Sequence, residues 1–106
     1  MSTQLAFRLG SGRAASLDEQ FEAWIRTTHG QEVYLAVIAR AFRLQRAGVT
    51  HYGIGAICEA IRFSWTIRRG PDVWKVNNNW RSRMARLAMA EYPALEGFFE
   101  TRELRS

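Results

Sequence analysis

Residues 54–69, "IGAICEAIRFSWTIRR", form an apolar helical pattern that decides the fold. Two apolar stripes run along this stretch at helical spacing, one made of Ile54, Ile57, Ile61 and Trp65 and the other of Ala56, Ala60, Phe63 and Ile67. A helix that is apolar on two sides has to be covered on both of them. We therefore predict a mainly α-helical bundle of four principal helices, in which this third helix is central.

Two helices are predicted before the central one. The stretch "SLDE" is a capping box, in which the Ser16 side chain accepts from the backbone of Glu19 and the Glu19 side chain reaches back. The apolar spacing that follows predicts a first helix over 17–28 that stops at Gly30. A second helix is predicted over 31–47.

The fourth helix is predicted to begin after Asn78 or Asn79 and to run to about Glu91, ahead of Pro93. The segment before it contains "DVWKV", which alternates and is rich in β-forming residues. This pattern fits a short β wing at 72–77, and so a winged-helix-like variant of the bundle.

The length of 106 residues fits one domain. Residues 1–15 show no period and are predicted to be a mobile N-terminal arm, so that the single helical domain spans 16–106. Cys58 is the only cysteine, which excludes an internal disulfide and a paired-cysteine zinc site and suits a reducing cytosol. No apolar run approaches the ~18 residues of a membrane span, so a membrane partner is not expected.

The positive charge is concentrated in the middle of the chain. Residues 40–86 hold ten cations and two anions, a net +8, whereas the rest of the chain carries −3. This asymmetry predicts one positive face, which attracts nucleic acid. The alternative is solubility in a genome that prefers arginine codons, since fourteen of the fifteen cations are arginine.

The stretch "KVNNNWRSRMAR", residues 75–86, carries the candidate binding residues. One asparagine explains a helix cap and a second explains a left-handed turn, so the third is available to a ligand. A helix N-terminus is also a ready anion site. The predicted nucleic-acid-binding residues are Lys75, Asn77, Asn78, Asn79, Arg81, Arg83 and Arg86, extended by Arg68 and Arg69.

Arginine binds a phosphate through two parallel hydrogen bonds and can also recognise guanine edges, and asparagine can recognise adenine edges. We expect Ser82, Arg83 and Arg86 to share the outward face opposite Trp80. Trp74 either stacks on an exposed base or packs under the loop. The alternative for the whole stretch is a tight turn, with its arginines paired to carboxylates at Glu91, Glu96 or Glu100.

The sequence contains no residue pattern that is typical of a catalytic site. His29 and His51 are isolated near predicted helix ends and are interpreted as capping or surface residues, and Cys58 as a small core residue. There is no phosphate-binding glycine loop, no dinucleotide-binding turn and no Cys/His metal spacing. We therefore expect no catalysis, no cofactor and no metal.

The segments "YGIGAICEAIRFSW", "KVNNNWRSRMARLAM" and "EGFFETREL" resemble segments of small proteins encoded in bacteriophages and prophages. The shared features are an aromatic-Gly-Ile entrance, a K-x-N-N-N turn, an R-x-x-x-A-R helix and an aromatic-acidic ending, over roughly residues 20–105. The resemblance implies a phage or prophage origin, and with it the cytoplasm of a bacterial host. It implies no particular activity.

The function predicted from these patterns is nucleic-acid binding without catalysis, with DNA favoured over RNA. The alternative is a small phage protein that binds and inhibits or adapts a host protein, such as a defence nuclease complex. A third hypothesis is self-association into a homo-oligomer through Phe98 and Phe99.

Overall fold

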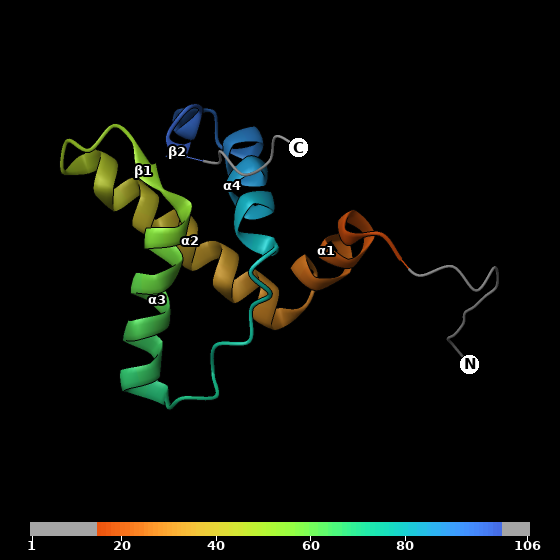
Figure 1. Cartoon of the computed structure of the whole chain (residues 1–106). Helices are drawn as coiled ribbons and strands as arrows, with labels where there is room; N and C mark the ends of the chain where they lie inside the picture. Colours follow the sequence, from red (N-terminus) through yellow and green to blue (C-terminus); the bar gives the residue numbers. More distant parts are fainter. Residues whose placement is uncertain (1–14, 101–106) are drawn as a thin grey trace, which may run out of the picture.

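The computed structural model describes residues 15–100 and is mainly helical, with four principal helices as predicted (Figure 1). The elements, in chain order, are α1 (Leu17–Ile25), α2 (Thr28–Arg46), β1 (Tyr52–Gly53), α3 (Ile54–Arg69), α4 (Trp80–Glu91), the 3-10 turn η1 (Pro93–Leu95) and β2 (Phe99–Glu100). Apart from residue 15, the predicted N-terminal arm lies outside the described residues.

The capping box at the start of α1 is confirmed. The backbone N–H of Glu19 donates to Ser16 Oγ at 3.1 Å, and the N–H of Ser16 donates to Glu19 Oε1 at 2.9 Å. The end of α1 differs from the prediction, because Thr27 caps the next helix by accepting from the N–H of Gly30 at 2.9 Å. Helix α2 therefore begins three residues earlier than the predicted second helix.

Gly30 lies inside α2 and does not stop the first helix as predicted. It is buried where α2 passes the end of α1, and a Cβ at this position would come within 2.1 Å of the carbonyl oxygen of Trp24. The glycine is thus required by a close approach of two backbones, which allows the sharp change of direction between the two helices.

The short sheet lies at the start of α3 and not in the predicted wing. Strands β1 and β2 run parallel, with Tyr52 opposite Phe99, and the N–H of Tyr52 donates to the carbonyl of Phe98 at 3.0 Å. Residues 72–77 form no strand. Their apolar side chains pack inward instead, and the Trp74 ring meets the Trp65 ring edge-on at 5.9 Å, which favours the packing role for Trp74.

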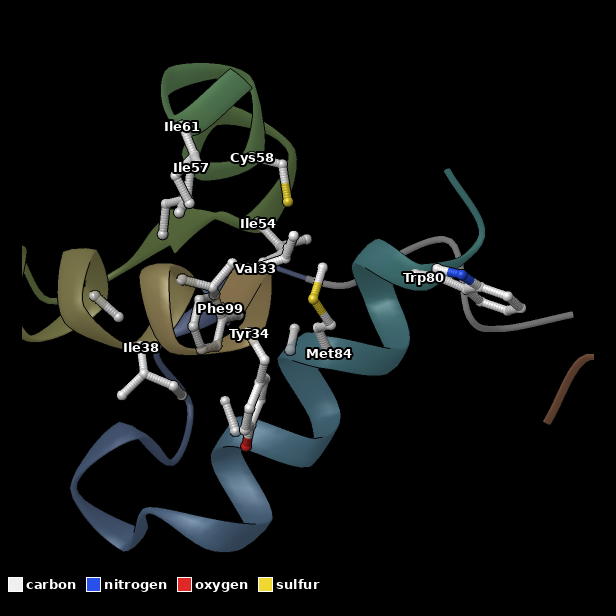
Figure 2. Close-up of a cluster of buried hydrophobic side chains, with 14 of the residues drawn as sticks. Val33, Tyr34, Ile38, Ile54, Ile57, Cys58, Ile61, Trp80, Met84 and Phe99 are labelled. Carbon is white, nitrogen blue, oxygen red and sulfur yellow. The ribbon is translucent and has the colours of Figure 1, made fainter. Parts of the chain in front are cut away.

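The core lies where α2, α3, α4 and the C-terminal segment meet, and several of its side chains are drawn in Figure 2. Met84 of α4 is fully buried among side chains of α2 and α3, which include Val33 and Ile54. Cys58 is also fully buried, which confirms its interpretation as a small core residue.

Only one of the two predicted stripes of α3 is covered. The stripe of Ile54, Ile57, Ile61 and Trp65 is buried, whereas Phe63 is 71% and Ile67 is 69% exposed. The expectation of cover on both sides is wrong because α2 and α4 both pack against the first stripe. The described residues therefore leave an apolar face of α3 open to solvent.

Two isoleucines on α3 provide a matched test of this orientation. Ile61 is fully buried and Ile67 is 69% exposed. We expect Ile61→Ala to lower the free energy of unfolding by about 2–5 kcal/mol, because it leaves a cavity in the core. Ile67→Ala should change it by no more than about 0.5 kcal/mol. Urea titrations followed by tryptophan fluorescence measure both, and equal losses would contradict this orientation of α3.

Candidate nucleic-acid interface

The asparagine run forms a turn that uses only its first side chain. Asn77 Oδ1 accepts from the N–H of Asn79 at 2.8 Å, and the carbonyl of Asn77 accepts from the N–H of Trp80 at 2.9 Å. Asn79 occupies the N-cap position of α4 without a side-chain cap bond. Within residues 15–100, the side-chain amides of Asn78 and Asn79 have no hydrogen-bond partner. The structural turn thus explains Asn77 and leaves two exposed amides available to a ligand.

The first turn of α4 is buried on two sides. The ring of Trp80 packs against Phe21 and Trp24 of α1, with centroids 5.6 and 6.2 Å apart. Ser82 is only 6% exposed. The expectation that Ser82 lies on the outward face with Arg83 and Arg86 is therefore wrong, because this helix end contacts the protein on the side away from Trp80 as well.

Arg69, Arg81 and Arg83 are held by carboxylates of the chain itself. Arg81 pairs with Glu59 of α3 at 2.5 Å between Nη2 and Oε2, and Arg69 pairs with Glu32 of α2 at 2.6 Å. Three predicted binding residues therefore have partners already, although these partners are not the predicted Glu91, Glu96 or Glu100.

Arg69 and Arg83 have further contacts that give them a structural role. The guanidinium of Arg69 lies 4.5 Å from the centre of the Trp65 ring. The Arg83 side chain is 18% exposed, and it donates to Asp18 at 3.0 Å and to the carbonyl of Asn79 at 3.2 Å. These contacts connect α4 to α1 and hold the turn before α4.

The remaining predicted cations are Lys75, Arg68 and Arg86, which are exposed and have no ion pair within residues 15–100. Because Arg69, Arg81 and Arg83 are paired with carboxylates, fewer cations are available on this surface than the sequence predicts.

The start of α3 borders a cavity of about 360 Å³ that the sequence did not predict. Its lining comes from the first turn of α3, the start of α4 and the C-terminal strand, and comprises Gly53, Ile54, Gly55, Ala56, Asn78, Arg81, Ser82 and Glu100. Two of these residues, Asn78 and Arg81, belong to the predicted site. The cavity thus joins the asparagine turn to a second helix N-terminus.

The N-terminus of α3 is not capped by a side chain. Gly53 is its N-cap residue, and its first turn contains no acidic residue. The first N–H groups of a helix lack internal partners and carry a partial positive charge. Arg81 lies against this positive end, with Nη1 3.6 Å from the position that a Cβ on Gly55 would occupy.

One buried polar atom beside the cavity lacks a partner. Arg81 Nε is buried and has no hydrogen-bond partner in the described structure. Ser82, which is 6% exposed, also lines the cavity. A buried donor without a partner destabilises a protein by about 1–3 kcal/mol. Since this Nε has almost no accessible surface, it is a cost of packing the Arg81 side chain and does not face the cavity.

Two carboxylates lie near these donors. The bond from Arg81 holds the pKa of Glu59 below its usual range. Glu100 lines the cavity, and one of its oxygens lies 3.3 Å from His51 Nε2. An anion at this cavity would thus meet the helix end and the Arg81 guanidinium, but also two negative charges at the rim.

The other chemically reactive groups do not line the cavity, although His51 contacts Glu100 at its rim. Burial raises the pKa of Cys58 to about 11, so its thiol stays protonated near neutral pH. His51 is exposed, whereas His29 is half-buried beside the Trp24 ring and is not the surface residue expected. In the described range, His, Cys, Asp and Glu form no group of three that could hold a metal ion, and no helix is long and apolar enough to cross a bilayer.

In comparisons with known proteins, no family model, curated protein or solved structure matches the chain. The origin implied by the resemblance to phage proteins stays a prediction. The case for a function accordingly rests on the geometry of the cavity and of the surface around it.

The sequence did not predict three of the cavity residues, because the cavity forms only through tertiary packing. Gly53, Gly55 and Ala56 join it because β1 pairs with β2 and because α4 packs beside α3. The one local signal is "YGIGA", a helix start that has glycines where a Ser, Asp or Asn cap is usual.

Two arginines on α4 test whether Arg83 stabilises the fold and whether Arg86 does not. Arg83→Ala removes two hydrogen bonds and a mostly buried side chain, so we expect the free energy of unfolding to fall by about 1 kcal/mol. Arg86→Ala removes an exposed cation and should change it by less than about 0.5 kcal/mol. Thermal melts of both variants make the comparison, and an unchanged Arg83→Ala melt would refute the structural role.

Proposed function

We propose that this protein binds nucleic acid without catalysis, through the surface where the start of α3 meets the start of α4. One observation carries the proposal: an uncapped helix end, the Arg81 guanidinium and an amide-rich turn converge on one open cavity. All three present hydrogen-bond donors, and a phosphate offers only acceptors at neutral pH.

The surface around the cavity extends the site. Lys75, Arg86 and Arg68 are exposed cations that hold phosphates, and the amides of Asn78 and Asn79 bond to the backbone or to base edges. DNA is the expected polymer, because asparagine reads adenine in a major groove that is open in DNA and inaccessible in duplex RNA. Arg69 and Arg83 stabilise this surface through their ion pairs with other helices.

Salt dependence tests the proposal directly. Retention of a mixed DNA and RNA pool should fall steeply between low and high salt, because each phosphate contact releases counterions. The double variant Lys75→Ala with Arg86→Ala should reduce the slope of log affinity against log salt by about 2. The control is Arg26→Ala with Arg46→Ala, which removes the same charge from the C-cap of α1 and the last residue of α2 and should leave the slope nearly unchanged. No retention by the wild type at low salt would refute the proposal.

A second candidate function is binding to a protein partner, and the open face of α3 favours it. Phe63 and Ile67 are exposed there. Arg40, Arg43 and Tyr52 line a separate cavity of about 300 Å³ that also reaches α3 through Ala60. Exposed aromatic and arginine side chains are enriched where proteins bind each other.

The two candidates respond to different substitutions. Phe63→Ser with Ile67→Ser should leave nucleic-acid retention unchanged and should abolish capture of a protein from a nuclease-treated bacterial lysate. Capture that survives this change would count against the α3 face, and capture that depends on added nucleic acid would favour the first function.

A further inference from the structure

We propose that the open apolar face of α3 binds a second copy of this chain, with the two α3 helices antiparallel about a two-fold axis. The face consists of Ala56, Ala60, Phe63 and Ile67, which are all exposed in the described part of the chain. Figure 1 shows α3 at one edge of the molecule. Phe98 and Phe99, which the sequence suggested for self-association, are buried in the core and do not form this contact. The inference is independent of nucleic-acid binding, since the asparagine turn lies outside this face.

The first argument is the order of side-chain sizes along this face. Ala56 and Ala60, nearer the start of α3, are small, whereas Phe63 and Ile67, nearer its end, are large. A two-fold axis midway between Ala60 and Phe63 makes each of them the counterpart of the other. The same axis is midway between Ala56 and Ile67, which are therefore counterparts too. An antiparallel second copy thus places each large side chain opposite a small one, as in well-packed helix pairs.

A parallel pair would lack this fit. It would set Phe63 against Phe63 and Ala60 against Ala60, which crowds one end of the contact and leaves a gap at the other. In the antiparallel pair, one face provides both halves of the fit. This is the property that a two-fold contact requires, because the same patch is used by both copies.

The second argument is a cavity at the place where Phe63 of the second copy would lie. Ala60 lines the cavity of about 300 Å³ together with Ile57 and Tyr52. The proposed pairing sets the Phe63 ring of the second copy against Ala60, at the mouth of this cavity. Phe63 is 71% exposed in the single chain, and an aromatic ring of this kind contributes strongly to an interface when it is covered. Each copy thus offers a ring and a recess for the ring of the other.

The third argument is the charge beside the stripe. Glu59 and Arg62 are three residues apart and both are exposed, so they lie on the same side of α3. The antiparallel pair brings Glu59 of each copy near Arg62 of the other, whereas a parallel pair would bring like charges together. The Glu59 side chain is 55% exposed although it is paired with Arg81, so it can contact the second copy as well.

Sedimentation velocity from micromolar to millimolar concentration tests the dimer. One helix pair buries less surface than the ~1,200–2,000 Å² of a stable complex, so we expect a dimer in equilibrium with the monomer. The average mass of the wild type should rise from 12.2 kDa toward twice that value. A wild type that stays monomeric at every concentration would overturn the proposal.

Phe63→Glu places a charge in the centre of the contact, and its dissociation constant should rise by about tenfold or more. The matched control is Leu35→Glu. Leu35 is 53% exposed on α2 and lines a different cavity with residues of α1 and α4, so this change should leave self-association nearly unchanged. Equal dissociation constants for the two variants would show that the dimer uses another surface.

Exchanging the two central side chains tests the pairing itself. Phe63→Ala leaves a gap opposite Ala60, and Ala60→Phe sets two rings against each other, so each change alone should weaken the dimer. The combined variant again has one large and one small side chain at each contact, and we expect it to associate more tightly than either single variant. A combined variant that associates no more tightly than the single variants would overturn the antiparallel pairing.

A different protein on this face is the competing outcome. If the wild type is monomeric throughout but captures a bacterial protein that Phe63→Glu does not capture, the face binds that protein and the dimer is refuted. Nucleic-acid retention by Phe63→Glu should match that of Leu35→Glu, because both changes add the same charge outside the asparagine turn. Self-association and nucleic-acid binding can therefore fail separately.

Discussion

The burial of the first turn of α4 is the constraint on which the rest of the structure depends. The Trp80 ring packs against Phe21 and Trp24, so α4 contacts α1 although the two helices are far apart in the sequence. Met84, one turn later, fills the centre of the core. With both side chains fixed, the rotation of α4 is fixed as well, and Arg81 is directed toward the start of α3. The candidate site is therefore a consequence of core packing.

Local patterns predicted much of the fold. The capping box at Ser16, the covered stripe of α3 and the buried thiol of Cys58 all depend on residues within one helix or one turn, and all three predictions are confirmed. The end of the first helix was misplaced because Gly30 suggests a stop. The close passage of α2 past Trp24, which requires this glycine, is set by tertiary packing.

The candidate site was predictable only in part, for a similar reason. The sequence predicts that Asn78 and Arg81 bind a ligand, and the structure shows that both line the cavity. The sequence could not identify Glu59, Asp18 and Glu32 as partners of the arginines, because each ion pair joins two different helices. A count of charges along the chain gives the number of cations, but packing determines which of them can contact a ligand.

Three of the predicted binding arginines are paired with carboxylates of the chain, so the surface has fewer available cations than the sequence predicts. Surface charge attracts any polyanion from a distance, whereas a helix end and a guanidinium edge require an acceptor at a defined position. On the proposed function, exposed Lys75 and Arg86 would supply the first kind of attraction and the cavity the second. The open apolar face of α3, which contains Phe63, lies on another side of this helix from its core stripe and remains available to a partner.

The central claim is that Arg81 is held beside an open cavity at an uncapped helix end, and that this surface binds the phosphates of a nucleic acid. The most direct measurement follows the arginine guanidinium signals by NMR during a titration with inorganic phosphate, with the Arg81 signal assigned by its loss in Arg81→Lys. The account predicts a saturable shift of this signal while that of Arg83, already bonded to Asp18, stays in place. An unchanged Arg81 signal up to saturating phosphate would contradict it.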